Sequence, residues 1–220
     1  EIEALAIGFL HAYANPVHEQ LVRDCVLEQF PDLSVSISSE VYGGRREYER
    51  FCSACLNAFT QPMFADYVAR LEAGLKGLGV RGDLFVMSSS GGTLTPTTAK
   101  RLPVRVVESG PAAGVQMSVF HGHTLGLGEL LSFDMGGTTA KGALVRAGEA
   151  MKVYELEVAR QHDFKAGSGL PLRTPVIDMI EIGAAQVDEA SVMGAIKFGY
   201  EEGIKPILEM QLELMEKAGR

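Results

Sequence analysis

Short apolar runs that predict β-strands alternate along the chain with longer stretches of helical spacing. The predicted strands span residues 4–10, 33–38, 84–87, 129–133, 141–146 and 151–158, and the predicted helices span 16–29 and 47–77, the second interrupted by Pro62. The last three strands are close enough in sequence to be antiparallel neighbours. Strands separated by helical segments indicate an α/β fold built on a layered sheet.

The most informative stretch is Leu-Ser-Phe-Asp-Met-Gly-Gly-Thr-Thr-Ala-Lys-Gly-Ala-Leu-Val at residues 131–145. It predicts a buried strand, a tight loop of Asp134, Gly136, Gly137, Thr138 and Thr139, and a second strand. Glycines let backbone N–H groups approach an anion closely, and the two hydroxyls add hydrogen bonds to phosphate oxygens. Asp134, at the end of an apolar strand, is placed to hold Mg²⁺ through water. The loop is not a Walker A motif, which opens a helix; it suits the nucleotide clamp of actin-like ATPases. The alternative is an ordinary hairpin with a Gly-Gly turn.

The segment before this loop supports the nucleotide interpretation. Residues 103–107 predict a strand, and a small-residue helix follows to about Phe120. Ser109 is the expected N-cap, and the small residues 112–114 would let the helix pack closely on a neighbour. In actin-like ATPases such a helix precedes the second phosphate loop at the hinge between two lobes. Ser109 and Gly110 are therefore further candidates for nucleotide binding.

Several separate segments together resemble the hydantoinase A/5-oxoprolinase family, which includes ATP-dependent acetone and acetophenone carboxylase-type subunits. The resemblance covers about residues 1–185. It is carried by Asn15-Pro-Val-His-Glu19, Glu47-Tyr-Glu-Arg50, Asn57-Ala58 with Pro62, Met87-Ser-Ser-Ser-Gly-Gly92, residues 108–115, residues 134–141, and Pro175-Val-Ile-Asp-Met179 before Ile182-Gly183. The Thr-Thr-Ala-Lys ending of the loop looks more like the carboxylase-type branch than the hydantoinase branch.

The resemblance implies a fragment of an actin-like (ribonuclease H-like) ATPase, with a mixed sheet, flanking helices and Mg-ATP bound between two lobes. It implies phosphoryl activation of a substrate oxygen, followed by hydrolysis of a cyclic amide of hydantoin or 5-oxoproline type or by carboxylation of a ketone. Such an enzyme takes a small-molecule substrate and often works with a second subunit or as a homo-oligomer.

The family's functional roles transfer onto matching positions of the loop. Asp134 is the expected metal-binding and catalytic residue, and Gly136, Gly137, Thr138 and Thr139 are the expected phosphate-binding residues. Lys141 replaces an acidic residue of the hydantoinase pattern. It could pair with a phosphate or a carboxylate, or it could be a solvated strand residue.

Two departures from the family pattern limit this interpretation. Family members carry an earlier Asp-x-Gly-Gly-Thr loop, and no such loop precedes residue 103 here. We therefore expect a fragment with half of the phosphate clamp, inactive alone. Alternatives are a non-catalytic nucleotide- or subunit-binding actin-like module, or an inactive chimeric fragment.

The second departure follows Ile182-Gly183, where the family's glycine-rich stretch is missing. Residues 186–220 instead predict a helical tail, which weakly resembles a helical segment of polynucleotide phosphorylase. The predicted domains are therefore the ATPase region at 1–185 and this tail, which is either a plain amphipathic helical pair or a join of unrelated genes.

Charge and composition narrow the classes of partner that this chain is expected to bind and the compartment in which it is expected to lie. The net charge of −8 argues against non-specific nucleic-acid binding. No apolar run approaches the roughly 20 residues of a membrane helix. An odd number of cysteines, three, indicates reduced thiols, so we expect a cytoplasmic protein.

Four other features have ordinary structural explanations beside functional ones. His18 and Glu19 at a helix start indicate capping, with a substrate-side role as the alternative. The dense charges at 45–50 indicate a solvated face or a local salt-bridge network. Cys52 and Cys55 have metal or redox spacing but no second pair. Residues 87–92 follow a strand, where α/β sheets commonly place ligand loops.

Overall fold

The computed structural model describes residues 2–136, 139–162 and 167–183. The described residues form two compact units. Unit 1 comprises those within Glu1–Ser132 and Ala143–Asp178, and unit 2 comprises those within Phe133–Gly142 and from Met179 onward. The loop residues Gly137 and Thr138 and the predicted tail at 186–220 lie outside the described residues.

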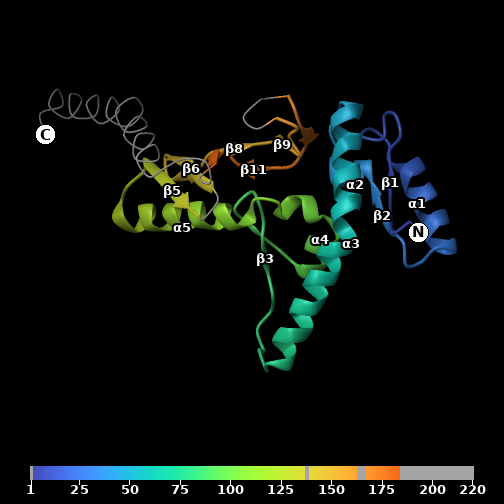
Figure 1. The fold of residues 1–220 in the computed structure, drawn as a ribbon, viewed down its shortest axis with the longest axis horizontal. Helices are drawn as coiled ribbons and strands as arrows, with labels where there is room; N and C mark the ends of the chain where they lie inside the picture. The colour runs from blue at the N-terminus through green and yellow to red at the C-terminus, as the bar shows by residue number, and fades with distance from the viewer. Residues whose placement is uncertain (1, 137–138, 163–166, 184–220) are drawn as a thin grey trace, which may run out of the picture. The chain divides into compact units, whose positions relative to one another are not determined.

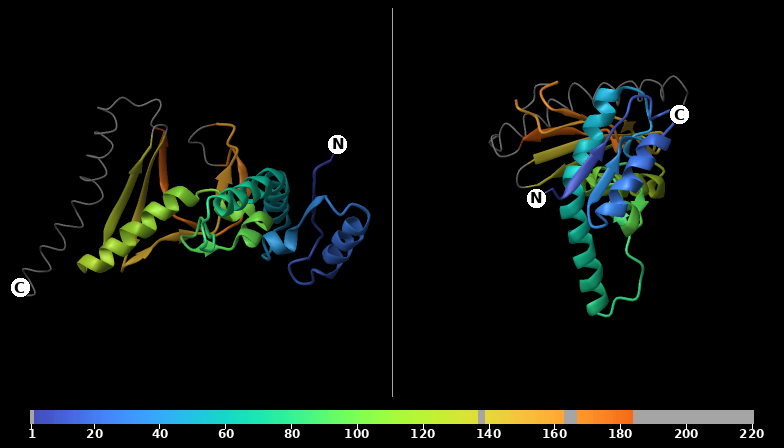
Figure 2. Two further views of the ribbon diagram at one scale, coloured as in Figure 1. Left: turned by 90° about the horizontal axis from the view of Figure 1, so that it is seen from below. Right: turned by 90° about the vertical axis from the view of Figure 1, so that its right-hand side faces the viewer.

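Unit 1 begins with a β–α–β arrangement. Strand β1 (Ala4–Ile7) and strand β2 (Ser34–Ile37) are parallel, and helix α1 (Val17–Gln29) connects them. The two strands end side by side, because Ile7 is the register partner of Ile37. They lie between α1 and the long helix α3 (Glu47–Gly77), and the short helix α2 (Ser38–Val41) follows β2 directly (Figures 1 and 2). This part confirms the α/β prediction.

Helix α3 runs unbroken for 31 residues, so the predicted interruption at Pro62 is wrong. A proline removes one helical hydrogen bond and crowds the preceding turn. The cost is offset here because α3 packs against β1, β2, α2 and α4 along much of its length. Tertiary packing thus decides the length of this helix rather than local propensity.

The middle of unit 1 contains short elements. They are β3 (Val86–Met87), β4 (Thr93–Leu94), α4 (Pro96–Arg101), the 3₁₀ helix η1 (Pro103–Val106) and α5 (Ser109–Leu125). The strand predicted at 103–107 is therefore wrong. Its backbone is bound by other elements: Asn57 Oδ1 accepts from Val104 N–H at 3.5 Å, and Arg105 C=O accepts from Ser89 N–H at 2.8 Å. A sequence of β-forming residues cannot reveal such partners.

The remaining strands form several small sheets rather than one layered sheet, which corrects the prediction. The strands are β5 (Leu130–Met135), β6 (Thr139–Arg146), β7 (Glu149–Ala150), β8 (Lys152–Val153), β9 (Leu156–Val158), β10 (Leu170–Leu172), β11 (Val176–Ile177) and β12 (Ile180–Gly183). Antiparallel pairs join β6 to β7 and β12, β8 to β11, and β9 to β10. The strand predicted at 151–158 is divided because β8 and β9 have different partners. Within the described part of the chain, no helix is long and apolar enough to cross a membrane.

Asn57, on the buried face of α3, joins three elements of unit 1. Its side-chain amide donates to Ser36 Oγ on β2 at 2.9 Å and to the Arg101 carbonyl at the end of α4 at 3.0 Å. Its Oδ1 accepts the Val104 N–H of η1. The side chain is 1% exposed, so without it the Arg101 carbonyl and the Val104 N–H would lose a buried partner, whereas Ser36 Oγ would keep its bond to Gln61.

We expect Asn57→Ala to lower the free energy of unfolding by about 2–3 kcal/mol, because buried polar groups would be left unpaired. Urea unfolding followed by circular dichroism measures this change. Gln29→Ala, at the exposed end of α1, is the control and should change stability by less than about 0.5 kcal/mol. Equal decreases in the free energy of unfolding of the two variants would contradict the role of Asn57 in joining β2, α4 and η1.

Candidate functional site

The predicted phosphate loop joins β5 to β6. Asp134 lies near the end of β5 with its side chain exposed, and Gly136 is exposed beside it. The Gly136 N–H donates to the Thr139 carbonyl at 2.9 Å, which closes the turn. The described part of the loop therefore has the predicted strand–loop–strand form, and it brings Asp134, Gly136 and Thr139 together.

Packing does not explain the glycine at position 136. A Cβ added there would meet the Thr139 carbonyl at 3.7 Å, an ordinary van der Waals contact, and no other described atom is closer. Gly136 is also not among the positive-φ residues. Neither backbone conformation nor contact within the described residues requires glycine here.

Lys141 lies two residues beyond Thr139 on β6, so both side chains are on the same face of the strand. Its ammonium is 3.6 Å from Glu181 Oε1 on β12, and the two residues are register partners. Its side chain is only 13% exposed, so Lys141 is not the solvated strand residue considered above. A carboxylate is instead its observed neighbour.

Ser109 and Gly110 are the first two residues of α5, in unit 1, whereas the phosphate loop belongs to unit 2. Glu108 occupies the N-cap position, so the prediction that Ser109 caps this helix is wrong by one residue. Close packing of the small residues is confirmed at Ala112, which is fully buried. It is not seen at Gly114, where no described atom lies within 4 Å of an added Cβ.

The loop at 87–92 acts as a structural junction in unit 1. Ser89 donates to the Arg105 carbonyl through both its N–H and its hydroxyl, and its own carbonyl accepts the Ile177 N–H at 2.8 Å. Gly91 has φ +85°, and a Cβ there would collide with the Gln116 side chain. These contacts explain the sequence of this loop without a ligand, and its predicted ligand role stays a prediction.

The described residues add nothing to the metal or redox role considered for Cys52 and Cys55. Cys52 and Cys55 are free thiols one turn apart on α3, and the described residues contain no group of three metal-ligating side chains. Two hollows in unit 1, of about 570 and 580 Å³, are lined by neither the phosphate loop nor Ser109.

Sequence reasoning missed a buried charged network in unit 1, built on Glu19 and Arg50. Both side chains are 0% exposed, so of the two expectations for the charges at 45–50 the solvated face is wrong for Arg50. The local salt-bridge network is confirmed by the pairs Arg46–Glu49 at 3.2 Å and Arg50–Glu47 at 4.0 Å. The signal was available on α3: Arg50, Ser53 and Asn57 share one helix face with Ala54 and Ala58, and all five are buried.

The Glu19 carboxylate binds the chain that follows both parallel strands. It accepts from Phe9 N–H at 2.8 Å after β1, and from Ser38 Oγ at 2.5 Å and Ser39 N–H at 2.9 Å after β2. Glu19 therefore does more than complement the α1 dipole, which was its predicted role.

Arg50 completes the network from α3. Its guanidinium donates to Ser38 Oγ at 3.0 Å, to the Phe9 carbonyl at 2.6 Å and to the Gly44 carbonyl at 3.3 Å. Ser38 Oγ thus lies between Glu19 and Arg50 and links the two buried charges.

The ionisation of Glu19 reflects this network. Burial alone would raise the pKa of its carboxyl. The hydrogen bonds from Ser38, Ser39 and Phe9 outweigh burial and hold the pKa below its ordinary value. The charged form is therefore favoured in the folded protein.

Glu19→Gln should lower the free energy of unfolding near pH 7 by about 2 kcal/mol, because an amide cannot replace the carboxylate as acceptor at every contact. Since the folded pKa of Glu19 is depressed, its contribution is complete above the ordinary value of 4.5 and is lost as the pH falls through the folded pKa. The difference between wild type and variant should shrink in acid. The measurement is urea unfolding at several pH values, with exposed Glu28→Gln as control. A difference that does not change with pH would contradict the charged state of Glu19.

Comparisons with known proteins agree with the motifs. The chain is 34% identical over 213 residues to an uncharacterized protein of Methanocaldococcus jannaschii. The matched region covers 92% of this chain and 31% of that protein. It is 30% identical over 188 residues to the acetone carboxylase beta subunit of Xanthobacter autotrophicus, covering 84% of this chain and 25% of the subunit. The chain thus spans about a third or less of the length of these relatives.

A solved structure that is similar to this chain belongs with the same carboxylase relatives. A nucleotide-free structure described as showing ATP-dependent acetone carboxylation superposes with a TM-score of 0.66 at 30% identity, covering 83% of this chain and 25% of that one. The Hydantoinase/oxoprolinase family matches residues 50–187, more than half of the chain. The chain therefore belongs to the hydantoinase/oxoprolinase family.

Proposed function

We propose that this chain carries the second phosphate loop of an ATP-dependent enzyme, which activates an oxygen of a small substrate by phosphoryl transfer. The observation that carries the proposal is the strand–loop–strand at Asp134–Thr139, with an exposed carboxylate at the strand end and a glycine that packing does not require. Family membership supports it, since the family is named for hydantoinases and oxoprolinases, and a relative is a ketone carboxylase subunit.

The residues present fit magnesium and a phosphate. Asp134 offers the hard oxygen donor that Mg²⁺ prefers, reached through water. The Gly136 N–H is held by the Thr139 carbonyl, but the absence of a Cβ at Gly136 would let a phosphate oxygen approach the other backbone N–H groups of the loop closely. When bound, Mg-ATP would supply the phosphoryl group that makes the substrate oxygen a good leaving group.

The chain's own contribution is mostly positioning and charge. Asp134 holds the metal side of the loop, and the loop N–H groups with the Thr138 and Thr139 hydroxyls orient phosphate oxygens. Lys141 adds a positive charge on the Thr139 face of β6, where Glu181 fixes its direction. Ser109 and Gly110, at the start of α5 in unit 1, stay predicted nucleotide-binding residues.

The substrate is a cyclic amide or a ketone, and the active form includes a second subunit or a second copy of the chain. The named relative is itself one subunit of a carboxylase, which supports such a partner. A second candidate function is a non-catalytic nucleotide- or subunit-binding module.

Calorimetric titration with Mg-ATP and Mg-ADP tests the loop. We expect magnesium-dependent binding that Asp134→Ala weakens at least about tenfold, the effect of losing one charge-assisted contact. Asp83→Ala, which removes an exposed carboxylate from a loop of unit 1, is the matched control and should bind as wild type does. Unchanged binding in Asp134→Ala, or binding independent of magnesium, would overturn the assignment.

Phosphate release separates the two candidate functions. An enzyme should release phosphate faster when a cyclic amide or a ketone is added together with its second subunit. A binding module should hold nucleotide without turnover under the same conditions.

A further inference from the structure

We propose that the C-terminal edge of β1 and β2 is a second ligand site, which takes a small organic carboxylate, with Arg45 as its cationic contact. This inference deepens the proposed function and rests on it for the idea that the ligand is the substrate. The site itself lies wholly in unit 1 and uses no residue of the phosphate loop.

The topology of unit 1 places two loops at this edge. Parallel strands β1 and β2 end together at Ile7 and Ile37, and the chain after each strand runs over the same edge. In open α/β sheets the ligand binds outside the carboxyl ends of the strands. Two segments that carry the family resemblance, 15–19 and 47–50, flank this edge, and the phosphate loop does not account for them.

The buried network fixes the shape of both loops. Glu19 binds Phe9 after β1 and Ser39 after β2, and Arg50 binds the Phe9 and Gly44 carbonyls. Glu19 and Arg50 are linked through Ser38 Oγ. The effect of the network here is geometric, since five backbone and hydroxyl groups of the two loops are held by two charged side chains.

Two of the four described non-glycine residues with positive φ lie at this edge. His11 has φ +58° and Arg46 has φ +75°, and neither is a glycine. Backbone N–H groups of Glu47 itself and of His11 donate to the Glu47 carboxylate and lower its pKa, so this side chain connects the two strained positions. Strained conformations of this kind persist only where the surroundings fix them, and they cluster at functional sites.

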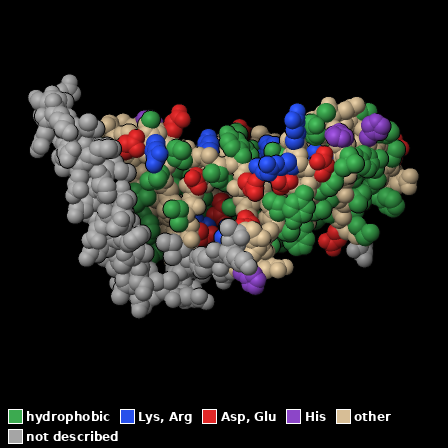
Figure 3. Space-filling view, turned by 90° about the horizontal axis from the view of Figure 1, so that it is seen from above, with side chains coloured by type: hydrophobic (Ala, Val, Ile, Leu, Met, Phe, Trp, Pro, Cys, Tyr) green, Lys and Arg blue, Asp and Glu red, His purple; other side chains and the backbone are tan. Residues whose placement is uncertain are grey.

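The charges leave one guanidinium available to a ligand. The Glu19 carboxylate accepts from Ser38 Oγ, Glu47 lies 4.0 Å from Arg50, and Arg46 pairs with Glu49 at 3.2 Å. Arg45 is exposed and stacks over the Tyr13 ring at 5.9 Å, and no ion pair among the described residues includes it. Figure 3, which looks onto this side of the molecule, shows basic, acidic and histidine side chains close together among hydrophobic groups in its right-hand half.

A carboxylate is the ligand that this arrangement fits. A guanidinium fork binds a carboxylate through two parallel hydrogen bonds, and stacking on Tyr13 limits its orientation. Tyr13 and the partly exposed Phe9 offer apolar surface for the carbon skeleton of the ligand. Phosphate would bind the Arg45 guanidinium equally well, but it has no carbon skeleton that could contact the apolar surface.

A pair of lactams that differ only in the carboxylate tests the inference. The probes are 5-oxoproline and pyrrolidin-2-one, titrated into the whole chain and followed by NMR. We expect 5-oxoproline to bind at least about tenfold more tightly than pyrrolidin-2-one, since one charge-assisted pair is worth that much. Inorganic phosphate is the third probe and should bind more weakly at this edge than 5-oxoproline.

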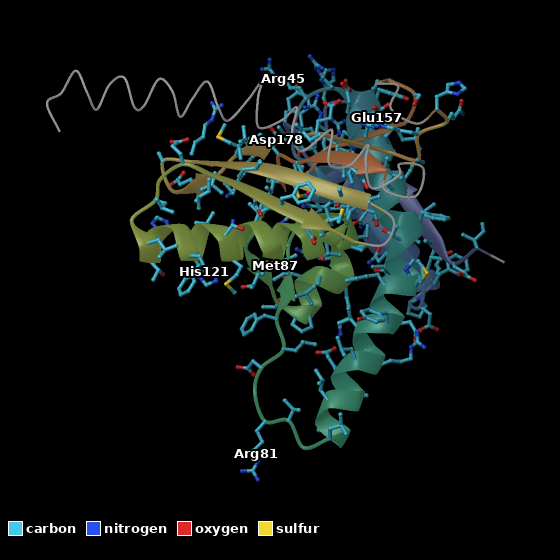
Figure 4. All side chains as sticks on the ribbon, turned by 60° about the vertical axis from the view of Figure 1, so that its left-hand side comes forward. Arg45, Arg81, Met87, His121, Glu157 and Asp178 are labelled. Carbon is cyan, nitrogen blue, oxygen red and sulfur yellow. The ribbon has the colours of Figure 1, made fainter. Side chains whose placement is uncertain are left out.

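Arg45→Gln should weaken 5-oxoproline binding about tenfold and leave pyrrolidin-2-one unchanged. Arg81→Gln is the matched control: Arg81 is exposed on the loop after α3, and Figure 4 shows it at the opposite end of that helix from Arg45. Equal binding of the two lactams, or of 5-oxoproline to wild type and Arg45→Gln, would overturn the site.

The two proposals can fail separately. Asp134→Ala should bind 5-oxoproline as wild type does, and Arg45→Gln should bind Mg-ADP as wild type does. Loss of lactam binding with nucleotide binding intact rejects the carboxylate site alone, and the reverse result rejects the phosphate loop alone. Absence of lactam binding in a folded wild-type chain also rejects the carboxylate site.

Discussion

The polar face of α3 is the constraint on which unit 1 depends. Arg50 holds the loops after β1 and β2, and Asn57 joins β2 to α4 and η1. Between them, Ser53 donates to the Glu49 carbonyl and accepts the Arg173 N–H at 2.8 Å, from a segment 120 residues further along the chain. Because these groups are buried and each has several partners, α3 must keep its position and length for every element it contacts.

Sequence patterns predicted the elements whose formation depends on local periodicity. The β–α–β start, the long helix and the hairpin at the phosphate loop follow from apolar spacing and from glycine in a tight turn. The failures share a different cause, since each was decided by a partner distant in sequence. Residues 103–106 form a 3₁₀ helix because Asn57 and Ser89 bind their backbone. Arg50 is buried because Ser38 Oγ and the Phe9 carbonyl supply partners that its neighbours in sequence do not reveal.

The candidate sites show the same difference between features that local sequence predicts and features that depend on partners distant in sequence. The phosphate loop was predicted from its residue types, because an anion loop needs glycine, hydroxyls and a carboxylate in a fixed order. The Glu19–Arg50 network was missed, because its parts come from three segments that meet only in the fold. The two candidate sites lie in different units, the predicted phosphate loop in unit 2 and the edge of β1 and β2 in unit 1.

The central claim, that the loop at Asp134–Thr139 binds a metal nucleotide, is tested most directly by NMR with Mn²⁺ in place of Mg²⁺. Paramagnetic Mn²⁺ broadens amide signals steeply with proximity, so it reports where the metal lies. On addition of Mn-ADP, the account predicts that broadening is centred on residues 134–139 and is absent with Mn²⁺ alone at the same low concentration. Broadening centred elsewhere, or none at saturating nucleotide, would contradict the account.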